Sequence, residues 1–241
     1  MNINETFDLI NFENSNINEK NKIASKIDDH LKNIGFLIVT NHGIKSNIIK
    51  NISLVLNSFF NKDQKFKNKS MAPYKGYPYG YFKSESEALA KSKGLDTPPD
   101  LKESFNGGPI KAPKGKISKE ALNFCYLPTI WPDVDDFEKS WKIYYNEMEN
   151  LSKRLMSVFA IALKLPSDYF KKFIDNPISA LRALNYPLIQ KEVLPKQQRA
   201  GAHTDYGSLT ILLPLDSIQG LQIKNSNNRW VNVPNVKNSF I

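Results

Sequence analysis

The stretch at residues 199–223, RAGAHTDYGSLTILLPLDSIQGLQI, contains a histidine and an aspartate two positions apart, His203 and Asp205. In an extended chain, side chains at positions i and i+2 point to the same face. A strand at this place would therefore direct an imidazole and a carboxylate toward one point. Gly201 and Gly207 flank the pair and allow tight backbone paths on either side. The pattern predicts a strand that presents two metal-ligating groups together.

These two groups are ligand types of the 2-His-1-carboxylate facial triad, the site of non-haem Fe(II) oxygenases. The His-x-Asp pattern alone is short, and a surface pair or a capping arrangement would also explain it. The residues that follow are more specific. They form a strand-like apolar run at 208–213, a turn region at 214–217, and the sequence Gly220-Leu221-Gln222.

Together these residues resemble the metal-site segment of the isopenicillin-N-synthase-like, Fe(II)/2-oxoglutarate-dependent dioxygenases. The family pattern is Gly-x-His-x-Asp-x-Gly-x-Leu-Thr-x-Leu followed by Gly-Leu-Gln, and every fixed position is present here. Three further stretches agree with the family: Gly-Phe…Asn-His-Gly-Ile at 35–44, Asp-x-Lys-Glu-x-Phe at 100–105, and Trp131-Pro132. The resemblance covers essentially all 241 residues.

Apolar residues at helical spacing predict the helices. One helix begins after Asn16, which together with Glu19 resembles a capping box. This helix ends at Gly35. A second helix is capped by Ser46. A long helix is expected at about 136–164, with an apolar stripe for the core made of Phe137, Trp141, Tyr144, Met148, Leu151, Leu155, Val158 and Ala162.

Strands are expected at both ends of the chain. Short apolar segments predict strands at 7–10 and 36–40. From Ser179 the apolar period changes toward two, which predicts that residues 179–241 are mostly strand. Within them, 219–224 and 229–233 form an expected hairpin, with Trp230 as a core anchor.

The resemblance implies an α+β fold with a mainly β core. That core is a double-stranded β-helix, or jelly roll, with the N-terminal and long central helices packed outside. Residues 1–110 are expected to form the N-terminal non-haem dioxygenase region. Residues 111–241 are expected to contain the long helix and an incomplete jelly-roll core.

Family members continue through more strands, which supply a second metal histidine and an Arg-x-Ser pair for the distal carboxylate of 2-oxoglutarate. No histidine follows His203 in this sequence. The chain is therefore expected to be C-terminally truncated and to be inactive by itself.

The resemblance also implies the site and its chemistry. His203 and Asp205 would bind Fe(II). Tyr186 stands at the end of an expected strand that terminates in Tyr-Pro, and it would lie against the co-substrate 2-oxoglutarate. That strand is expected to run beside the His203 strand. With O2, and with ascorbate as a possible reductant, the enzyme would oxidise a small organic substrate and release succinate and CO2. His42 is expected to be a hydrogen-bonded structural residue and His30 a solvated one.

Other functions remain open. Isopenicillin-type members use no 2-oxoglutarate, and ethylene-forming enzymes share the scaffold. A jelly-roll binding protein that has lost its chemistry is a further alternative, and the net charge of +9 raises the possibility of a nucleic-acid-binding module. The lysines are spread without an aromatic stacking pattern, however, so we expect no nucleic-acid partner.

Composition limits the cellular setting. The content of 41% hydrophobic and 24% charged residues is ordinary for a soluble globular protein. The single cysteine, Cys125, cannot form an internal disulfide, and no secretory signal or membrane-length apolar run is visible. We therefore expect a cytoplasmic monomer with no membrane partner.

Four tyrosines cluster in a loop with two glycines, at Tyr74, Tyr77, Tyr79 and Tyr81. They could form an aromatic wall near the substrate or anchor the loop by half-buried rings. We favour anchoring, because tyrosine commonly packs its ring while its hydroxyl finds a polar partner.

Overall fold

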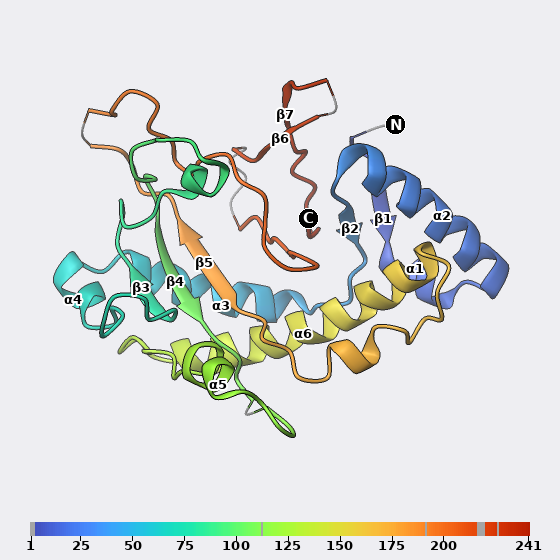
Figure 1. Cartoon of the computed structure of the whole chain (residues 1–241), viewed down its shortest axis with the longest axis horizontal. Helices are drawn as coiled ribbons and strands as arrows, with labels where there is room; N and C mark the ends of the chain where they lie inside the picture. Colours follow the sequence, from blue (N-terminus) through green and yellow to red (C-terminus); the bar gives the residue numbers. More distant parts are fainter. Residues whose placement is uncertain (1–2, 112, 191, 216–219, 226) are drawn as a thin grey trace. The chain divides into compact units, whose positions relative to one another are not determined.

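A computed structural model describes residues 3–111, 113–190, 192–215, 220–225 and 227–241. The chain forms two compact units (Figure 1). The first unit combines the residues up to Lys45 with Glu147–Asp175 and Ser208–Ile241. The second combines Ser46–Asn146 with Asn176–Gly207, so it contains His203, Asp205 and Tyr186. All three site residues expected from the sequence therefore belong to one compact unit.

The first unit begins with a parallel pair of short strands, β1 (Thr6–Asp8) and β2 (Ile38–Thr40). Helices α1 (Leu9–Asn14) and α2 (Ile17–Ile34) connect them. Asn16 and Glu19 form the expected capping box, and Gly35 ends α2 in the left-handed region at φ +88°. The first strand is shorter than expected because Asp8 caps α1, so that Leu9 is already helical.

His42 is a structural residue, as expected. It is 6% exposed, its Nδ1 accepts the Ile44 N–H at 3.1 Å, and its ring packs edge-on against Phe240. The Arg154 guanidinium donates to the His42 carbonyl at 2.6 Å. Burial lowers the pKa of the His42 imidazole.

The expectation that His30 is solvated was wrong. His30 is only 5% exposed, and its Nδ1 lies 3.8 Å from the Glu5 carboxylate. His30 stands on α2, where the helical pattern placed it on the polar side. Helical spacing cannot show that a neighbouring segment covers that position.

The C-terminal part of the first unit contains the expected hairpin. Strands β6 (Gln222–Lys224) and β7 (Trp230–Asn232) pair antiparallel, while residues 216–219 and 226 lie outside the described residues. Trp230 is 51% exposed, so its expected role as a core anchor was wrong. The end of the chain pairs with two segments: Phe240 exchanges hydrogen bonds with Val39, and Ile241 with Leu212.

The second unit is built around a three-stranded antiparallel sheet in the order β3-β4-β5. The strands are β3 (Gly80–Phe82), β4 (Glu103–Gly107) and β5 (Leu181–Asn185). The helical segments are α3 (Ser46–Phe60), α4 (Gln64–Asn68), the 3-10 turn η1 (Leu89–Lys93) and α5 (Lys119–Cys125). A second 3-10 turn, η2 (Lys171–Phe173), belongs to the first unit.

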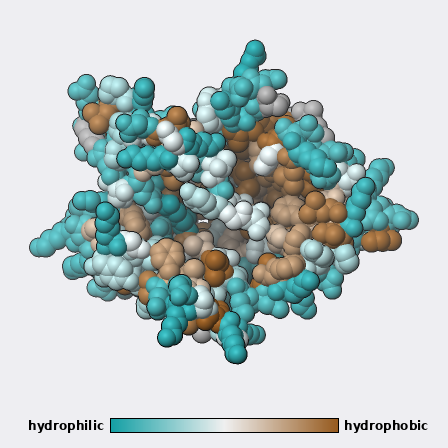
Figure 2. All heavy atoms as spheres, in the orientation of Figure 1, coloured by the Kyte–Doolittle hydropathy of each residue, from teal (hydrophilic) through white to brown (hydrophobic). Residues whose placement is uncertain are grey.

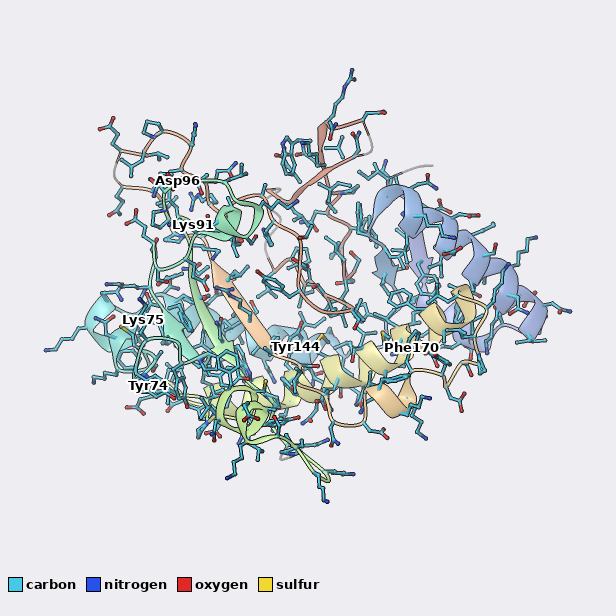
Figure 3. All side chains as sticks on the ribbon, in the orientation of Figure 1. Tyr74, Lys75, Lys91, Asp96, Tyr144 and Phe170 are labelled. Carbon is cyan, nitrogen blue, oxygen red and sulfur yellow. The ribbon has the colours of Figure 1, made fainter. Side chains whose placement is uncertain are left out.

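The long helix α6 (Phe137–Ala162) confirms the expectation for 136–164. Every residue of its expected stripe is buried except Met148, which is half-buried, and Figure 3 labels Tyr144 on this helix. Residues 137–146 of the helix belong to the second unit and the remainder to the first. Core packing therefore explains the aromatic and methionine pattern without a cofactor.

An aromatic cluster forms the core of the second unit. Phe105 on β4 is fully buried, with ring centroids 5.6 Å from Phe59, 5.0 Å from Phe137 and 5.1 Å from Trp141. These three pairs are edge-to-face, the arrangement that the ring quadrupole favours. The cluster joins α3, β4 and the start of α6 through one side chain.

The tyrosine loop is anchored rather than open, as favoured above. Tyr77, Tyr79 and Tyr81 are at most 6% exposed. Tyr77 and Tyr79 donate to the carbonyls of Pro128 and Cys125, and burial raises the pKa of Tyr79 to about 12. Only Tyr74, labelled in Figure 3, is exposed, at 59%.

Residues 179–241 contain less strand than expected. Among the described residues of this stretch only β5, β6 and β7 are strands, and 201–215 is irregular. The two-residue period is real, but a strand also needs a hydrogen-bonded neighbour. Within 201–215, the backbone pairing found is that of Leu212 with Ile241.

The described residues contain no helix that is long and apolar enough to cross a membrane. Hydrophilic residues cover most of the face shown in Figure 2, with hydrophobic residues between them. Exposed apolar side chains in the second unit include Leu188 at 87% and Tyr206 at 86%.

Phe105→Ala tests the aromatic cluster. We expect it to lower the free energy of unfolding by about 3–5 kcal/mol, because it removes a fully buried ring and leaves a cavity. Phe124→Ala is the matched control: Phe124 is 56% exposed, and its loss should change stability by less than about 0.5 kcal/mol. Urea denaturation followed by tryptophan fluorescence measures both, and equal effects would contradict the assigned core.

Candidate functional site

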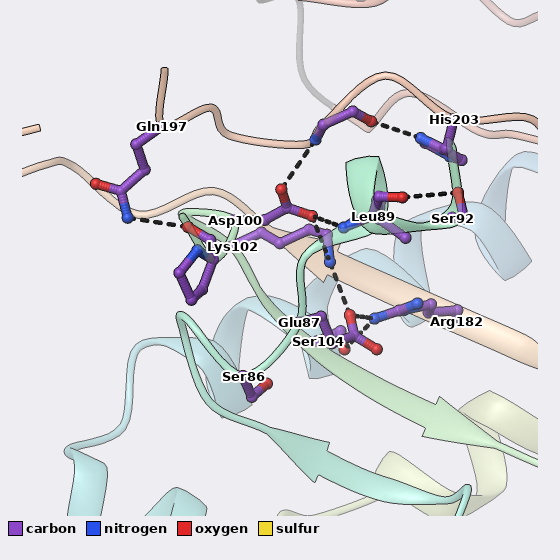
Figure 4. Close-up of polar contacts among 12 residues, drawn as sticks. Ser86, Glu87, Leu89, Ser92, Asp100, Lys102, Ser104, Arg182, Gln197 and His203 are labelled. Carbon is purple, nitrogen blue, oxygen red and sulfur yellow. Dashed lines mark hydrogen bonds and ion pairs between the residues drawn. The ribbon is translucent and has the colours of Figure 1, made fainter. Parts of the chain in front are cut away.

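The segment that carries His203 and Asp205 is tied to the residues before β4. The Leu101 N–H donates to the Gln198 carbonyl at 2.9 Å, and the Gln197 side chain donates to the Pro99 carbonyl at 2.9 Å. The Gly201 N–H donates to Asp100 Oδ1, also at 2.9 Å (Figure 4). The segment is thus fixed at three points although it is not a strand.

Gly201 approaches η1 more closely than any other residue type could. A Cβ at this position would lie 2.8 Å from both the Cβ and the backbone nitrogen of Ala90. The backbone nitrogen belongs to η1 and cannot move aside as the end of a side chain could. The glycine before the His-x-Asp pair therefore allows a close backbone contact, in agreement with the tight backbone path expected from the sequence.

The structure brings His203 and Asp205 together. His203 Nε2 and Asp205 Oδ1 are 3.3 Å apart, although the segment is not the strand that was expected. His203 Nδ1 lies 2.7 Å from the Gly201 carbonyl. A carbonyl oxygen can only accept, so Nδ1 carries the proton. In the neutral ring the lone pair is then on Nε2, whereas in a protonated ring the Nε2–H would donate to Asp205 Oδ1. The ring nitrogen that faces Asp205 is therefore the one available to a metal ion.

The donor set fits a cation such as Fe(II). An imidazole nitrogen and a carboxylate oxygen are two of the three ligands of the facial triad. Two ligands at about 2.1 Å from one metal ion and about 90° apart have donor atoms about 3.0 Å from each other. The observed 3.3 Å requires only a small adjustment.

The pair is partly open to solvent. The side chains of His203 and Asp205 are 34% and 55% exposed. Within the part of the chain that the structure describes, no group of three or more His, Cys, Asp or Glu side chains could hold a metal ion. His30 and His42 both belong to the first unit. Among the described residues, the candidate metal site therefore consists of the His203–Asp205 pair.

Tyr186 directly follows β5, at the end of a strand as expected, but the neighbour of that strand differs from the expectation. Strand β5 pairs with β4, not with the His203 segment, so the expected neighbouring strand was wrong. Tyr186 is 46% exposed, yet burial of its hydroxyl end raises its pKa, while the positive charges of Arg182 and Arg199 lower it. The charge of Asp100, which accepts the Gly201 N–H, also raises the pKa of Tyr186.

A buried ionic network lies beside this site, and the sequence reasoning had not assigned it a role. The Lys102 ammonium is 2.7 Å from Glu87 Oε2 and 3.7 Å from Asp100 Oδ2. Arg182 of β5 donates to the same Glu87 oxygen and to Ser104 Oγ (Figure 4). Burial opposes ionisation of Glu87, but Lys102 and Arg182 together hold its pKa below the usual range.

A second buried carboxylate, Glu103, has its own partners. It is 4% exposed and pairs with Lys67 at 2.8 Å. It also accepts hydrogen bonds from Tyr81 and from the Asn185 amide. The Asp-x-Lys-Glu-x-Phe stretch was a sequence signal for both networks, because neighbouring charges along a strand point to opposite faces.

Two family models match the chain. The one described as "non-haem dioxygenase in morphine synthesis N-terminal" matches residues 6–134, and the one described as "2OG-Fe(II) oxygenase superfamily" matches residues 178–241. The second match contains Tyr186 and the His203–Asp205 pair.

Relatives agree with these matches. A homoarginine-6-hydroxylase of Oryza sativa subsp. japonica is 29% identical over 91% of this chain, and a probable iron/ascorbate oxidoreductase of Dictyostelium discoideum is 28% identical over 92%. The chain spans 66% and 65% of their lengths. The crystal structure of a full-length Neurospora crassa protein in complex with alpha-KG superposes with a TM-score of 0.81, at 26% identity, over 98% of this chain and 70% of that one.

The fold and the two family matches together define the scaffold of a non-haem iron oxygenase. The chain belongs to the 2OG-Fe(II) oxygenase family, with the non-haem dioxygenase N-terminal region that characterises its isopenicillin-N-synthase-like members. The jelly-roll, α+β fold class expected from the sequence is that of its solved relatives and is confirmed.

Gly201→Ala tests the close approach to η1. A methyl group here must push the segment away from Ala90 and lengthen the hydrogen bond to Asp100. We expect the free energy of unfolding to fall by about 1–3 kcal/mol.

Gly220→Ala is the control, because no atom lies within 4 Å of its added Cβ; its effect should stay within about 0.5 kcal/mol. Both are measured by chemical denaturation. A Gly201→Ala protein as stable as the control would show that the backbone approach is not required.

Proposed function

We propose that this chain contributes the His-x-Asp half of the iron site of an Fe(II)/2-oxoglutarate-dependent oxygenase. The enzyme would oxidise a small organic substrate with O2 and release succinate and CO2. The observation that carries the proposal is the 3.3 Å separation of His203 Nε2 and Asp205 Oδ1, with Nδ1 engaged by the Gly201 carbonyl. The family match supports the same chemistry.

The chain's own residues would prepare the site before the metal binds. The Gly201 carbonyl favours the neutral tautomer whose Nε2 lone pair can bind a metal ion beside Asp205. Asp205 supplies the negative charge that attracts a divalent cation. Bound Fe(II) with 2-oxoglutarate would supply the oxidising chemistry, and ascorbate would keep the iron reduced.

Tyr186 is proposed to contact the co-substrate. A tyrosine hydroxyl is protonated at neutral pH, and burial raises the pKa of Tyr186 further, so it can donate a hydrogen bond to a carboxylate. The positive charges of Arg182 and Arg199 act on the same hydroxyl and would favour an anionic ligand nearby. The similar Neurospora crassa structure is a complex with alpha-KG, which is 2-oxoglutarate, and this supports the proposed co-substrate.

We further propose that the 241-residue chain by itself gives no substrate-coupled turnover. A facial triad needs three protein ligands, and the described residues bring together two. The division into regions at residue 110, the monomeric state and the cytoplasmic location stay predictions.

Replacement of each ligand tests the iron site. Co(II) is a suitable probe, because its visible spectrum reports nitrogen and oxygen ligation. We expect weak Co(II) binding by residues 1–241 that is lost in His203→Ala and in Asp205→Ala. Thr204 lies between the two proposed ligands, and the Thr204→Ala variant should bind Co(II) as the unchanged chain does. Equal binding by all four proteins would place the metal elsewhere.

Succinate release tests the reaction itself. The assay contains Fe(II), ascorbate and 2-oxoglutarate. It is run on residues 1–241 and, where the reading frame continues past codon 241, on the extended chain. Turnover is expected only in the extended chain. Robust succinate formation by residues 1–241 would overturn the proposed need for a further ligand, and substrate oxidation without succinate would favour an oxidase that uses no 2-oxoglutarate.

Tyr186→Phe tests the co-substrate contact in a chain that shows turnover. Loss of a hydrogen bond made equally in the ground and transition states raises KM and leaves kcat nearly unchanged. We therefore expect the KM for 2-oxoglutarate to rise more than kcat falls. Tyr206→Phe, at an 86% exposed position, is the matched control. Unchanged kinetics in Tyr186→Phe would assign this tyrosine to packing.

A further inference from the structure

Asp100 is a buried carboxylate that the proposed reaction does not use. It lies before β4 and is 2% exposed. Its Oδ1 accepts the Gly201 N–H at 2.9 Å, and its Oδ2 accepts the Leu89 N–H of η1 at 3.1 Å. Lys102 lies 3.7 Å from Oδ2 and balances the charge. Each oxygen thus holds the backbone of a different segment.

Gly201 connects Asp100 to the metal pair. Its N–H is held by Asp100, and its carbonyl accepts the Nδ1 proton of His203 at 2.7 Å (Figure 4). The orientation of the His203 ring therefore depends on where the Gly201 carbonyl lies. The position of that carbonyl depends in turn on the two anchors of Gly201, which are the Asp100 hydrogen bond and the contact with Ala90.

We propose that Asp100 is a positioning residue for the metal site. It fixes Gly201 so that the Gly201 carbonyl selects the Nδ1–H tautomer of His203 and directs Nε2 toward Asp205. This inference rests on the proposed function for its link to metal affinity. Its effect on the histidine ring itself does not depend on any bound metal.

The carboxylate is required because two backbone donors must be satisfied at once. Asparagine has a single acceptor oxygen, and its amide group would face the N–H of either Gly201 or Leu89. Asp100→Asn therefore releases one of the two segments while keeping the size of the side chain. Leaving a buried backbone N–H without a partner is unfavourable, so one segment must move to reach water.

Glu103 provides a matched control. It is also a buried carboxylate, at 4% exposure, and stands three positions further along the same stretch. Its partners are Lys67, Tyr81 and Asn185, none of which belongs to the segment 199–207. Glu103→Gln removes the same charge at similar burial without touching the Gly201 anchor, so it reports the general effect of losing a buried carboxylate.

The first measurement is nitrogen NMR of the histidine rings in the metal-free protein. It is made over a pH series, so that the neutral form of each ring is identified from the nitrogen shifts themselves. The chain has 3 histidines, and the His203 signals are those lost in His203→Ala. We expect the Nδ1–H tautomer of His203 in the unchanged chain and in Glu103→Gln. A mixture of tautomers is expected in Asp100→Asn.

The second measurement is Co(II) affinity, followed by the visible spectrum. Replacement of a group that orients a metal ligand through hydrogen bonds typically lowers metal affinity roughly 10–100-fold, and we expect a loss of that size for Asp100→Asn. Glu103→Gln should stay within about threefold of the unchanged chain, because it leaves the ligand orientation intact.

The outcomes separate this proposal from the proposed function. Identical histidine spectra in Asp100→Asn and Glu103→Gln would overturn the positioning role. An altered tautomer in Asp100→Asn, with no His203-dependent Co(II) binding in any protein, would support the positioning of His203 but remove the metal site. If Asp100→Asn does not fold, Gly201→Ala replaces it, because its added methyl group lengthens the same hydrogen bond to Asp100. A mixture of His203 tautomers in Gly201→Ala would support the positioning role, and a ring identical to that in Glu103→Gln would overturn it.

Discussion

The carboxylate of Asp100 is the contact on which the site geometry depends. It is buried, so it must be fully hydrogen-bonded. It satisfies this requirement with the backbone N–H groups of Leu89 and Gly201, the second of which is 101 positions away along the chain. One side chain thus holds η1 and the His203 segment against the start of β4. Gly201 allows the approach because any larger residue would collide with Ala90.

The sheet of the second unit places charge where a core strand would normally be apolar. Lys102 and Glu103 are both 4% exposed, and as neighbours on an extended chain they point to opposite faces. Each has an ionic partner on its own side, Glu87 for Lys102 and Lys67 for Glu103. Buried ion pairs contribute little net stability, but leaving one partner alone is costly, so such pairs penalise other arrangements of the strands. Both networks connect β4 to β5, through Arg182 and Asn185.

The long helices followed the sequence closely, whereas the strands expected after Ser179 formed only in part. The capping box at Asn16, the left-handed Gly35 and the apolar stripe of α6 are local features, formed by residues within a few positions of one another. A strand requires a hydrogen-bonded neighbour that can come from anywhere in the chain. The segment 201–215 has the two-residue period but does not form a strand. Strand β5 pairs with β4 and not with the His203 segment that had been expected as its neighbour. The buried His30 and the exposed Trp230 deviate for a similar reason, because local spacing does not show what covers a side chain.

The sequence by itself determined the family and the long helix, and it pointed to the two proposed metal-ligating residues, because these depend on residue types at fixed spacing. It also contained Asp100, Lys102 and Glu103 as part of a family stretch, without indicating what they do. Only the tertiary structure showed that Asp100 holds the Gly201 N–H while the Gly201 carbonyl faces His203 Nδ1. That arrangement joins residues more than a hundred positions apart. It follows from the need to satisfy a buried carboxylate, a requirement that no local pattern expresses.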